Sequence, residues 1–181
     1  GTTSSYEPIL FLEGINGVVT TQSLKEMNTG LMHSGSNLKS FYVLPEDASL
    51  ENIFSPLSSQ ISGIIGEGVA AINIDGTWTG SLQEINAESG YWLIMLEETD
   101  FSFYGYTIDP SLEYSLHPGT NLISFPSHGS IDISDGIPNE VEDQFTGIIS
   151  EGIAAMNIGE NWLGSLQFFE GTKGYWVQVQ S

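Results

Sequence analysis

The chain of 181 residues contains no arginine and only three lysines, Lys25, Lys39 and Lys173, against 23 acidic residues. Nucleic-acid binding requires cations that neutralise phosphates and release counterions, and binding to anionic membranes requires a similar basic cluster. Three scattered lysines provide neither, so both classes of partner are excluded. The formal net charge of −20 instead favours solubility and attraction for cations.

Cysteine is also absent, which excludes disulfides, zinc thiolate sites and thiol nucleophiles. No apolar run approaches the roughly 18–20 residues of a membrane-spanning helix, so we expect no membrane insertion. The sequence contains no HExxH, Walker or GxSxG motif, and its three histidines do not suggest a Ser-His-Asp triad. We therefore expect no catalytic activity and no cofactor. A glycosidase-like pair of carboxylates remains an alternative, because the acids offer many pairs.

The sequence repeats itself at a constant spacing. His33 recurs as His117, 84 positions later, and blocks that begin at Glu67, Trp78 and Gly90 recur at the same distance, at Glu151, Trp162 and Gly174. About 25 of the 65 positions aligned in this way are identical. A constant, gap-free spacing is typical of an internal duplication.

The chain is therefore divided near 97/98. Residues 1–97 comprise an N-terminal extension and repeat module 1, whose core is 33–97. Residues 98–181 contain repeat module 2, whose core is 117–181. The extension is expected to include a strand at 9–12.

Each module is expected to be β-rich. Segments 37–44 and 121–126 combine apolar, aromatic and β-branched residues after a glycine, which predicts a strand. Segments 69–74 and 77–85 flank Asp75-Gly76, a strong hairpin signal. A last strand is predicted at 91–96 and 175–180, and one further strand at 101–108 or 18–21.

A short helix is predicted between the first strand and the hairpin. In the first module, apolar residues follow helical spacing from Leu50 to Ile61, with Ser49 as the N-cap and Pro56 as a break. In the second, Ile137, Val141 and Phe145 repeat every four residues after a well-placed Pro138. The fold class is therefore α+β and β-rich: two tandem homologous β-α-β-β-β modules with mostly antiparallel sheets, which could pack about a pseudo-twofold axis.

Polar residues identical in both modules are candidates for a duplicated ligand-binding site. The candidates are Glu67 and Asn73 in the first module and Glu151 and Asn157 in the second. The alternative is that the asparagines cap turns and the glutamates satisfy backbone amides. That alternative explains the identities by the needs of the fold.

Aromatic residues are also shared by both modules. Trp78 and Trp162 follow the hairpin turn and could stack on a sugar, so we include them among the ligand-binding candidates. Neighbouring residues in a strand point to opposite faces. One of Tyr91 and Trp92 is therefore expected in the core, and we assign Trp92 and its counterpart Trp176 to it.

Acidic residues gather in the second module and could hold Ca²⁺, which prefers six to eight oxygen ligands. The weak metal candidates are Asp132, Asp135, Glu140 and Asp143. Their spacing is not that of an EF-hand, and a solvated helix start is the preferred explanation. A Ca²⁺-dependent structural domain nevertheless remains an alternative.

The blocks 119–126 (Gly-Thr-Asn-Leu-Ile-Ser-Phe-Pro) and 172–176 (Thr-Lys-Gly-Tyr-Trp) resemble a repeat family of large secreted proteins of marine and related bacteria. The family's usual form is Gly-Trp-Asn-Leu-Ile-Ser-Phe-Pro followed by Gly-Tyr-Trp, and both copies here lack its first Trp (Ser36, Thr120). The resemblance implies an extracellular, multidomain context and no defined activity. We expect a non-catalytic module of a secreted or cell-surface protein that serves adhesion, spacing or carbohydrate recognition. Its partner would be a carbohydrate or another surface protein.

Overall fold

The computed structural model describes residues 23–159 and 161–180. Within these residues every strand pair is antiparallel, which confirms the β-rich, mostly antiparallel prediction. The strands predicted at 9–12 and 18–21 lie outside the described residues. No helix in the described part of the chain is long and apolar enough to cross a bilayer.

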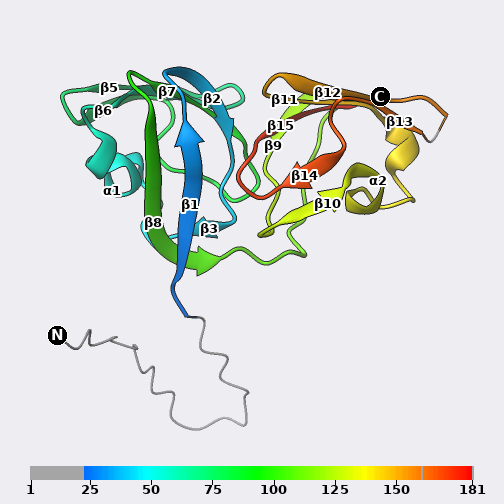
Figure 1. Cartoon of the computed structure of the whole chain (residues 1–181), viewed down its shortest axis with the longest axis horizontal. Helices are drawn as coiled ribbons and strands as arrows, with labels where there is room; N and C mark the ends of the chain where they lie inside the picture. Colours follow the sequence, from blue (N-terminus) through cyan, green and yellow to red (C-terminus); the bar gives the residue numbers. More distant parts are fainter. Residues whose placement is uncertain (1–22, 160, 181) are drawn as a thin grey trace, which may run out of the picture.

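The N-terminal half forms one lobe (Figure 1). Its strands are β1 (Lys25–Met32), β2 (Gly35–Lys39), β3 (Val43–Leu44), β4 (Ile61–Ile65), β5 (Ala70–Ile74), β6 (Thr77–Gly80), β7 (Tyr91–Met95) and β8 (Thr99–Thr107). Its helices are α1 (Leu50–Phe54) and the 3-10 turn η1 (Ser55–Leu57).

The C-terminal half forms the other lobe (Figure 1). Its strands are β9 (Gly119–Ile123), β10 (Ser130–Asp132), β11 (Phe145–Ser150), β12 (Ile153–Asn157), β13 (Trp162–Gly164), β14 (Phe168–Glu170) and β15 (Tyr175–Val179). Its helices are α2 (Ile133–Gly136) and the 3-10 turn η2 (Glu142–Gln144).

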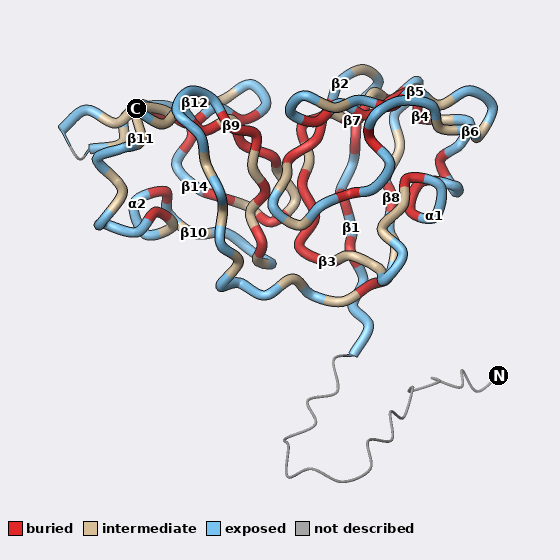
Figure 2. Tube along the Cα trace, turned by 180° about the vertical axis from the view of Figure 1, so that it is seen from behind, coloured by how far each residue is buried: buried red, intermediate tan, exposed pale blue. Residues whose placement is uncertain are grey.

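Each lobe carries a five-stranded sheet. The strand order is β2-β7-β4-β5-β6 in the first and β9-β15-β11-β12-β13 in the second. The two sheets lie along the same side of the molecule (Figure 1), and buried residues lie beneath both (Figure 2). The inner faces of the sheets therefore cover the two hydrophobic clusters, while the outer faces point to solvent.

The central strands β4 and β11 were missing from the predicted β-α-β-β-β module. The helical spacing that continued to Ile61 was wrong there, because α1 ends at Phe54 and η1 at Leu57. Pro56, which cannot donate a backbone hydrogen bond, lies in η1. Ile61 then begins β4, which pairs with both β5 and β7. The predicted N-cap is confirmed, because the Ser49 side chain accepts a hydrogen bond from the Asn52 amide at 3.3 Å.

The helix predicted from Ile137, Val141 and Phe145 was also wrong. The helical turns of this region are α2, which ends at Gly136, and η2, whose next residue Phe145 begins β11. Ile137, Val141 and Phe145 recur every four residues because each contributes to the same hydrophobic cluster. Ile137 belongs to the second cluster, and the other two pack against it from different elements. In the first half, the strand predicted at 77–85 ends earlier, at Gly80.

Strand β8 belongs by its contacts to the first lobe. It lies between β1 and β3 in a three-stranded sheet, and Phe101 is part of the first hydrophobic cluster. The boundary proposed at 97/98 therefore separates β8 in sequence from the strands with which it pairs. The alternative strand predicted at 101–108 corresponds to β8.

Candidate functional site

Glu151 reaches from the second lobe to the first. Its Oε1 lies 2.6 Å from Nε2 of His33, and its Oε2 accepts a hydrogen bond from the backbone amide of Leu38 at 2.8 Å. One carboxylate therefore binds the turn and the strand β2 that follows it. The contact joins residues more than one hundred positions apart in the sequence.

Glu67 makes the same contacts in the opposite direction. Its Oε1 lies 2.6 Å from Nε2 of His117, and its Oε2 accepts a hydrogen bond from the amide of Leu122 at 2.7 Å. Each residue of one contact lies 84 positions from its counterpart in the other. We call the two sets together the reciprocal His–Glu contacts.

Asparagine side chains fix the turns that present the two histidines. The Asn37 side chain accepts a hydrogen bond from the His33 amide at 2.9 Å and donates one to the His33 carbonyl at 2.8 Å. Asn121 makes the same pair of bonds with His117, both at 2.8 Å. These shared asparagines, each almost fully buried, hold the histidine turns in place.

Both ring nitrogens of each histidine face an acceptor. Nδ1 of His33 lies 2.7 Å from the Ser34 carbonyl oxygen, and Nδ1 of His117 lies 2.9 Å from that of Pro118. These carbonyls, followed by the partner glutamates, raise the pKa of both histidines above the ordinary value. The arrangement favours an imidazolium that donates from both nitrogens, with no nitrogen left to act as a general base.

Backbone hydrogen bonds between the lobes follow the same reciprocal pattern. Gly90 donates to the Leu122 carbonyl at 3.2 Å, and Gly174 donates to that of Leu38 at 3.3 Å. The amide of Ser40 donates to Thr172, and that of Ser124 donates to Glu88. The Gly-Tyr-Trp and Asn-Leu-x-Ser blocks, singled out in the sequence, thus meet across the boundary between the lobes.

The structure separates the asparagine candidates from the glutamate candidates. Asn73 donates to the carbonyls of Ser58 and Ile61, both at 2.8 Å, and accepts from the Gly76 amide at 2.9 Å. Asn157 donates to the carbonyl of Glu142 at 3.0 Å. Both asparagines therefore tie the hairpin to the segment that precedes the central strand of their sheet.

Trp78 and Trp162 are half-buried and pack against the hydrophobic cluster of their own half. The Trp78 ring lies 6.0 Å from that of Phe54. The indole nitrogen of Trp162 donates to a carboxylate oxygen of Glu142 at 2.7 Å. Each indole is thus engaged in packing within its own lobe, while Glu67 and Glu151 bind the opposite lobe.

The assignment of Trp92 and Trp176 to the core was wrong. Tyr91 and Tyr175 are the buried members of each pair, at 1% and 0% exposure. Their hydroxyl oxygens accept hydrogen bonds from the amides of Asn86 at 2.8 Å and Glu170 at 2.6 Å, so burial leaves neither hydroxyl unpaired. The tryptophans are half-buried on the opposite faces of β7 and β15.

The four acidic metal candidates do not form a common group. Asp132 precedes α2 without a side-chain capping bond, and Asp143 lies in η2. Among residues 23–159 and 161–180, no group of three or more His, Cys, Asp or Glu side chains is placed to hold a metal ion.

Exposed aliphatic side chains occupy matching positions on the outer faces of both sheets. Ile65 lies opposite Trp92 across β4 and β7, and Ile149 lies opposite Trp176 across β11 and β15. The neighbouring strands add further exposed side chains at equivalent places, namely Ile72, Ile74, Met156 and Ile158. We call this set the outer apolar face. Apolar surface of this kind is typical of interaction sites.

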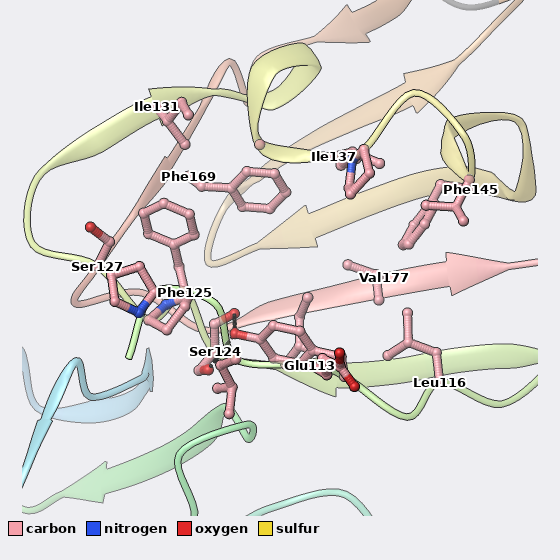
Figure 3. Close-up of a pocket in the computed structure, with 18 of the residues that line it drawn as sticks. Glu113, Leu116, Ser124, Phe125, Ser127, Ile131, Ile137, Phe145, Phe169 and Val177 are labelled. Carbon is pink, nitrogen blue, oxygen red and sulfur yellow. Dashed lines mark hydrogen bonds between the residues drawn. The ribbon is translucent and has the colours of Figure 1, made fainter. Parts of the chain in front are cut away.

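The second lobe contains a cavity of about 720 Å³ beneath its sheet. Figure 3 shows Phe125 and Phe169 on one side of it, Ile137 and Phe145 above, and Val177 and Leu116 opposite. The rings of Phe125 and Phe169 are stacked, with centroids 5.6 Å apart. Glu113 and Asp135 are the acidic residues of a lining that is otherwise mainly apolar.

No sequence argument identified this cavity. The cavity is bounded partly by residues outside the aligned repeats, since Pro110, Leu112, Glu113 and Leu116 precede the second repeat core at 117. Comparison of the chain with protein-family models, curated proteins and solved structures gives no match in any of the three. Function must therefore be argued from the contacts themselves.

Proposed function

We propose that the chain is a non-catalytic module of a secreted or cell-surface protein, built from two homologous modules packed about an approximate twofold axis. The observation that carries this proposal is the set of reciprocal His–Glu contacts. Exchanging each residue for its counterpart converts one contact into the other. Of the four polar candidates for a duplicated ligand site, Glu67 and Glu151 instead join the two lobes.

This arrangement suits a spacing or adhesion role. Charge-assisted hydrogen bonds and backbone bonds join the lobes at several points, so that the two sheets keep one orientation. The two sheets lie on the same side of the molecule (Figure 1), so a rigid pair of lobes would present the exposed side chains of both sheets together. Two copies of a weakly binding surface on a rigid support bind a repetitive partner more tightly than one.

For carbohydrate recognition we propose Trp92 and Trp176 rather than Trp78 and Trp162. The former lie on the outer apolar face beside exposed isoleucines, where a sugar ring could stack. The latter pack against the hydrophobic clusters. A second surface protein could use the same face.

A pull-down with insoluble polysaccharides and a glycan array test this proposal, with reducing sugars measured in the same samples. We expect retention without release of sugar, and loss of retention when Trp92 and Trp176 are changed to Ala. The matched control changes Tyr104, which is exposed on β8 of the other sheet. Catalytic release of sugar would contradict the proposal, and retention that survives the tryptophan changes would contradict the assigned face.

A further inference from the structure

We propose that the cavity of the second lobe accepts an extended strand from another polypeptide chain, with aromatic side chains at alternate positions. In the first lobe the corresponding space is filled by β8. That strand places Phe101 and Phe103, two residues apart and therefore on one face, against the hydrophobic cluster. Binding by strand addition combines main-chain hydrogen bonds with pockets for alternate side chains.

Ring contacts locate the equivalent place in the two lobes. The ring of Phe103 lies 5.8 Å from that of Phe41, and the ring of Phe101 lies 5.9 Å from that of Phe54. The residues 84 positions after Phe41 and Phe54 are Phe125 and Pro138. Both of these line the cavity. The cavity therefore lies where the aromatic side chains of β8 lie in the first lobe.

Equivalent apolar side chains are less buried in the second lobe than in the first, as an unfilled strand position predicts. Phe41, Leu57 and Ile61 belong with Phe101 to the first hydrophobic cluster and are almost fully buried, at 1–3% exposure. Their counterparts Phe125, Val141 and Phe145 are only half-buried. The second lobe thus leaves partly open the apolar side chains that the first lobe covers. Covering them would remove apolar surface from water.

Among residues 23–159 and 161–180, no strand lies beside the cavity as β8 lies beside the first hydrophobic cluster. In the first lobe β8 lies between β1 and β3, and the Thr29 hydroxyl donates to the Phe101 carbonyl at 3.0 Å. The counterpart of β1, residues 109–116, forms no strand and contributes Leu112, Glu113 and Leu116 to the cavity lining. An incoming strand could pair with this segment as β8 pairs with β1.

The chemistry of the partner strand follows from the lining. The apolar residues favour aromatic side chains on the inward face, as in Phe101-Ser102-Phe103. Glu113 and Asp135 and the net charge of −20 favour lysine or arginine at the ends of the strand.

Fluorescence anisotropy of a labelled peptide tests the inference with the full chain. The probe is a peptide of residues 98–108 with two lysines added at its N-terminus, and the control peptide carries Phe101→Ser and Phe103→Ser. We expect saturable binding of the probe, and binding of the control peptide weaker by about tenfold or more. Val141→Phe, which fills part of the cavity, should weaken binding of the probe to a similar extent. Met156→Phe, on the outer apolar face, should leave it unchanged.

Near-UV circular dichroism checks that the Val141→Phe protein is folded. Ile123→Trp is a second cavity-filling variant, which is used in case the first does not fold. The inference would be overturned if the probe showed no saturable binding or if the two peptides bound equally well. It would also be overturned if both cavity-filling variants bound the probe as tightly as the wild type. The inference rests on the proposed equivalence of the two modules. It does not use the outer apolar face, so a failed peptide experiment would leave retention on polysaccharides unaffected.

Discussion

Gly90 and Gly174 lie back to back where the two lobes meet. A Cβ atom on Gly90 would lie 3.2 Å from the Cα of Gly174 and 2.8 Å from the carbonyl oxygen of Ile123. A Cβ atom on Gly174 would lie 2.9 Å from the carbonyl oxygen of Lys39. The two glycines are therefore required by close approach between the lobes. Each donates its backbone N–H to a leucine of the opposite lobe.

Gly90→Ala is expected to destabilise the protein by about 1–3 kcal/mol, because the added methyl group meets backbone atoms that cannot move independently. Urea unfolding measures the change in the free energy of unfolding. Gly147→Ala is the control, since a Cβ there would lie at an ordinary 3.5 Å from the Ala155 carbonyl oxygen. Equal effects of the two changes would contradict the close approach.

The pKa of His33 and that of His117 are raised in the folded protein by backbone carbonyls and by the partner glutamates. A raised folded pKa contributes stability that is complete below the unfolded value of about 6.5 and is lost as the pH rises through the folded value. We expect the melting temperature to fall between pH 6 and pH 9. Aspartates and glutamates ordinarily remain ionised throughout this range.

The control for this pH dependence is the double variant His33→Gln, His117→Gln. Glutamine can occupy the space but does not gain a charge in this range. The difference in melting temperature between the wild type and the variant should shrink as the pH rises from 6 to 9. A difference that stays constant or grows would show that the histidines do not bind the glutamates as imidazolium ions.

Phe101→Ala is expected to cost about 3–5 kcal/mol of stability, as for a phenylalanine removed from a core. Phe101 is 5% exposed in the first hydrophobic cluster, although it follows the boundary at 97/98. The matched control is Phe168→Ala, because Phe168 is 46% exposed. The free energy of unfolding is measured by chemical denaturation. A loss for Phe101→Ala no larger than that for Phe168→Ala would show that β8 is not part of the first hydrophobic cluster.

Some of this fold followed directly from the pattern of residues. Hairpin β5–β6 was predicted because Asp75-Gly76 is a local signal, and Asp75 does adopt a positive φ of 51°. The strands β4 and β11 were missed because apolar runs on a central strand give no alternation, and helical spacing in the preceding residues extended into them. Tertiary pairing with two neighbours decided their conformation.

The candidate site was only partly predictable for a similar reason. Identity between the repeats identified Glu67 and Glu151, but it could not show that each would reach the histidine turn of the other half. That contact depends on how the lobes pack, which local patterns do not encode. The cavity was hidden because it depends on the place of β8, whose counterpart is absent from the repeat alignment.

Glu67→Gln and Glu151→Gln should each lower the free energy of unfolding by about 1 kcal/mol. The lost bonds are charge-assisted, but the glutamate side chains are 36% exposed, which places the effect at the low end for such bonds. Urea unfolding at pH 6 measures both changes. Glu140→Gln, at an exposed position, is the control and should stay within about 0.5 kcal/mol of the wild type. Effects no larger than that of the control would indicate that the contacts add nothing to stability.

The most direct test of the reciprocal His–Glu contacts is a two-dimensional ¹H–¹⁵N NMR spectrum of the Glu151→Gln and Glu67→Gln proteins. In Glu151→Gln the amide signal of Leu38 should move upfield as its bond to a carboxylate is lost, while that of Leu122 stays in place. In Glu67→Gln the amide signal of Leu122 should move upfield, while that of Leu38 stays in place. Unmoved signals of Leu38 and Leu122 in both variants would contradict the account that these glutamates join the two lobes.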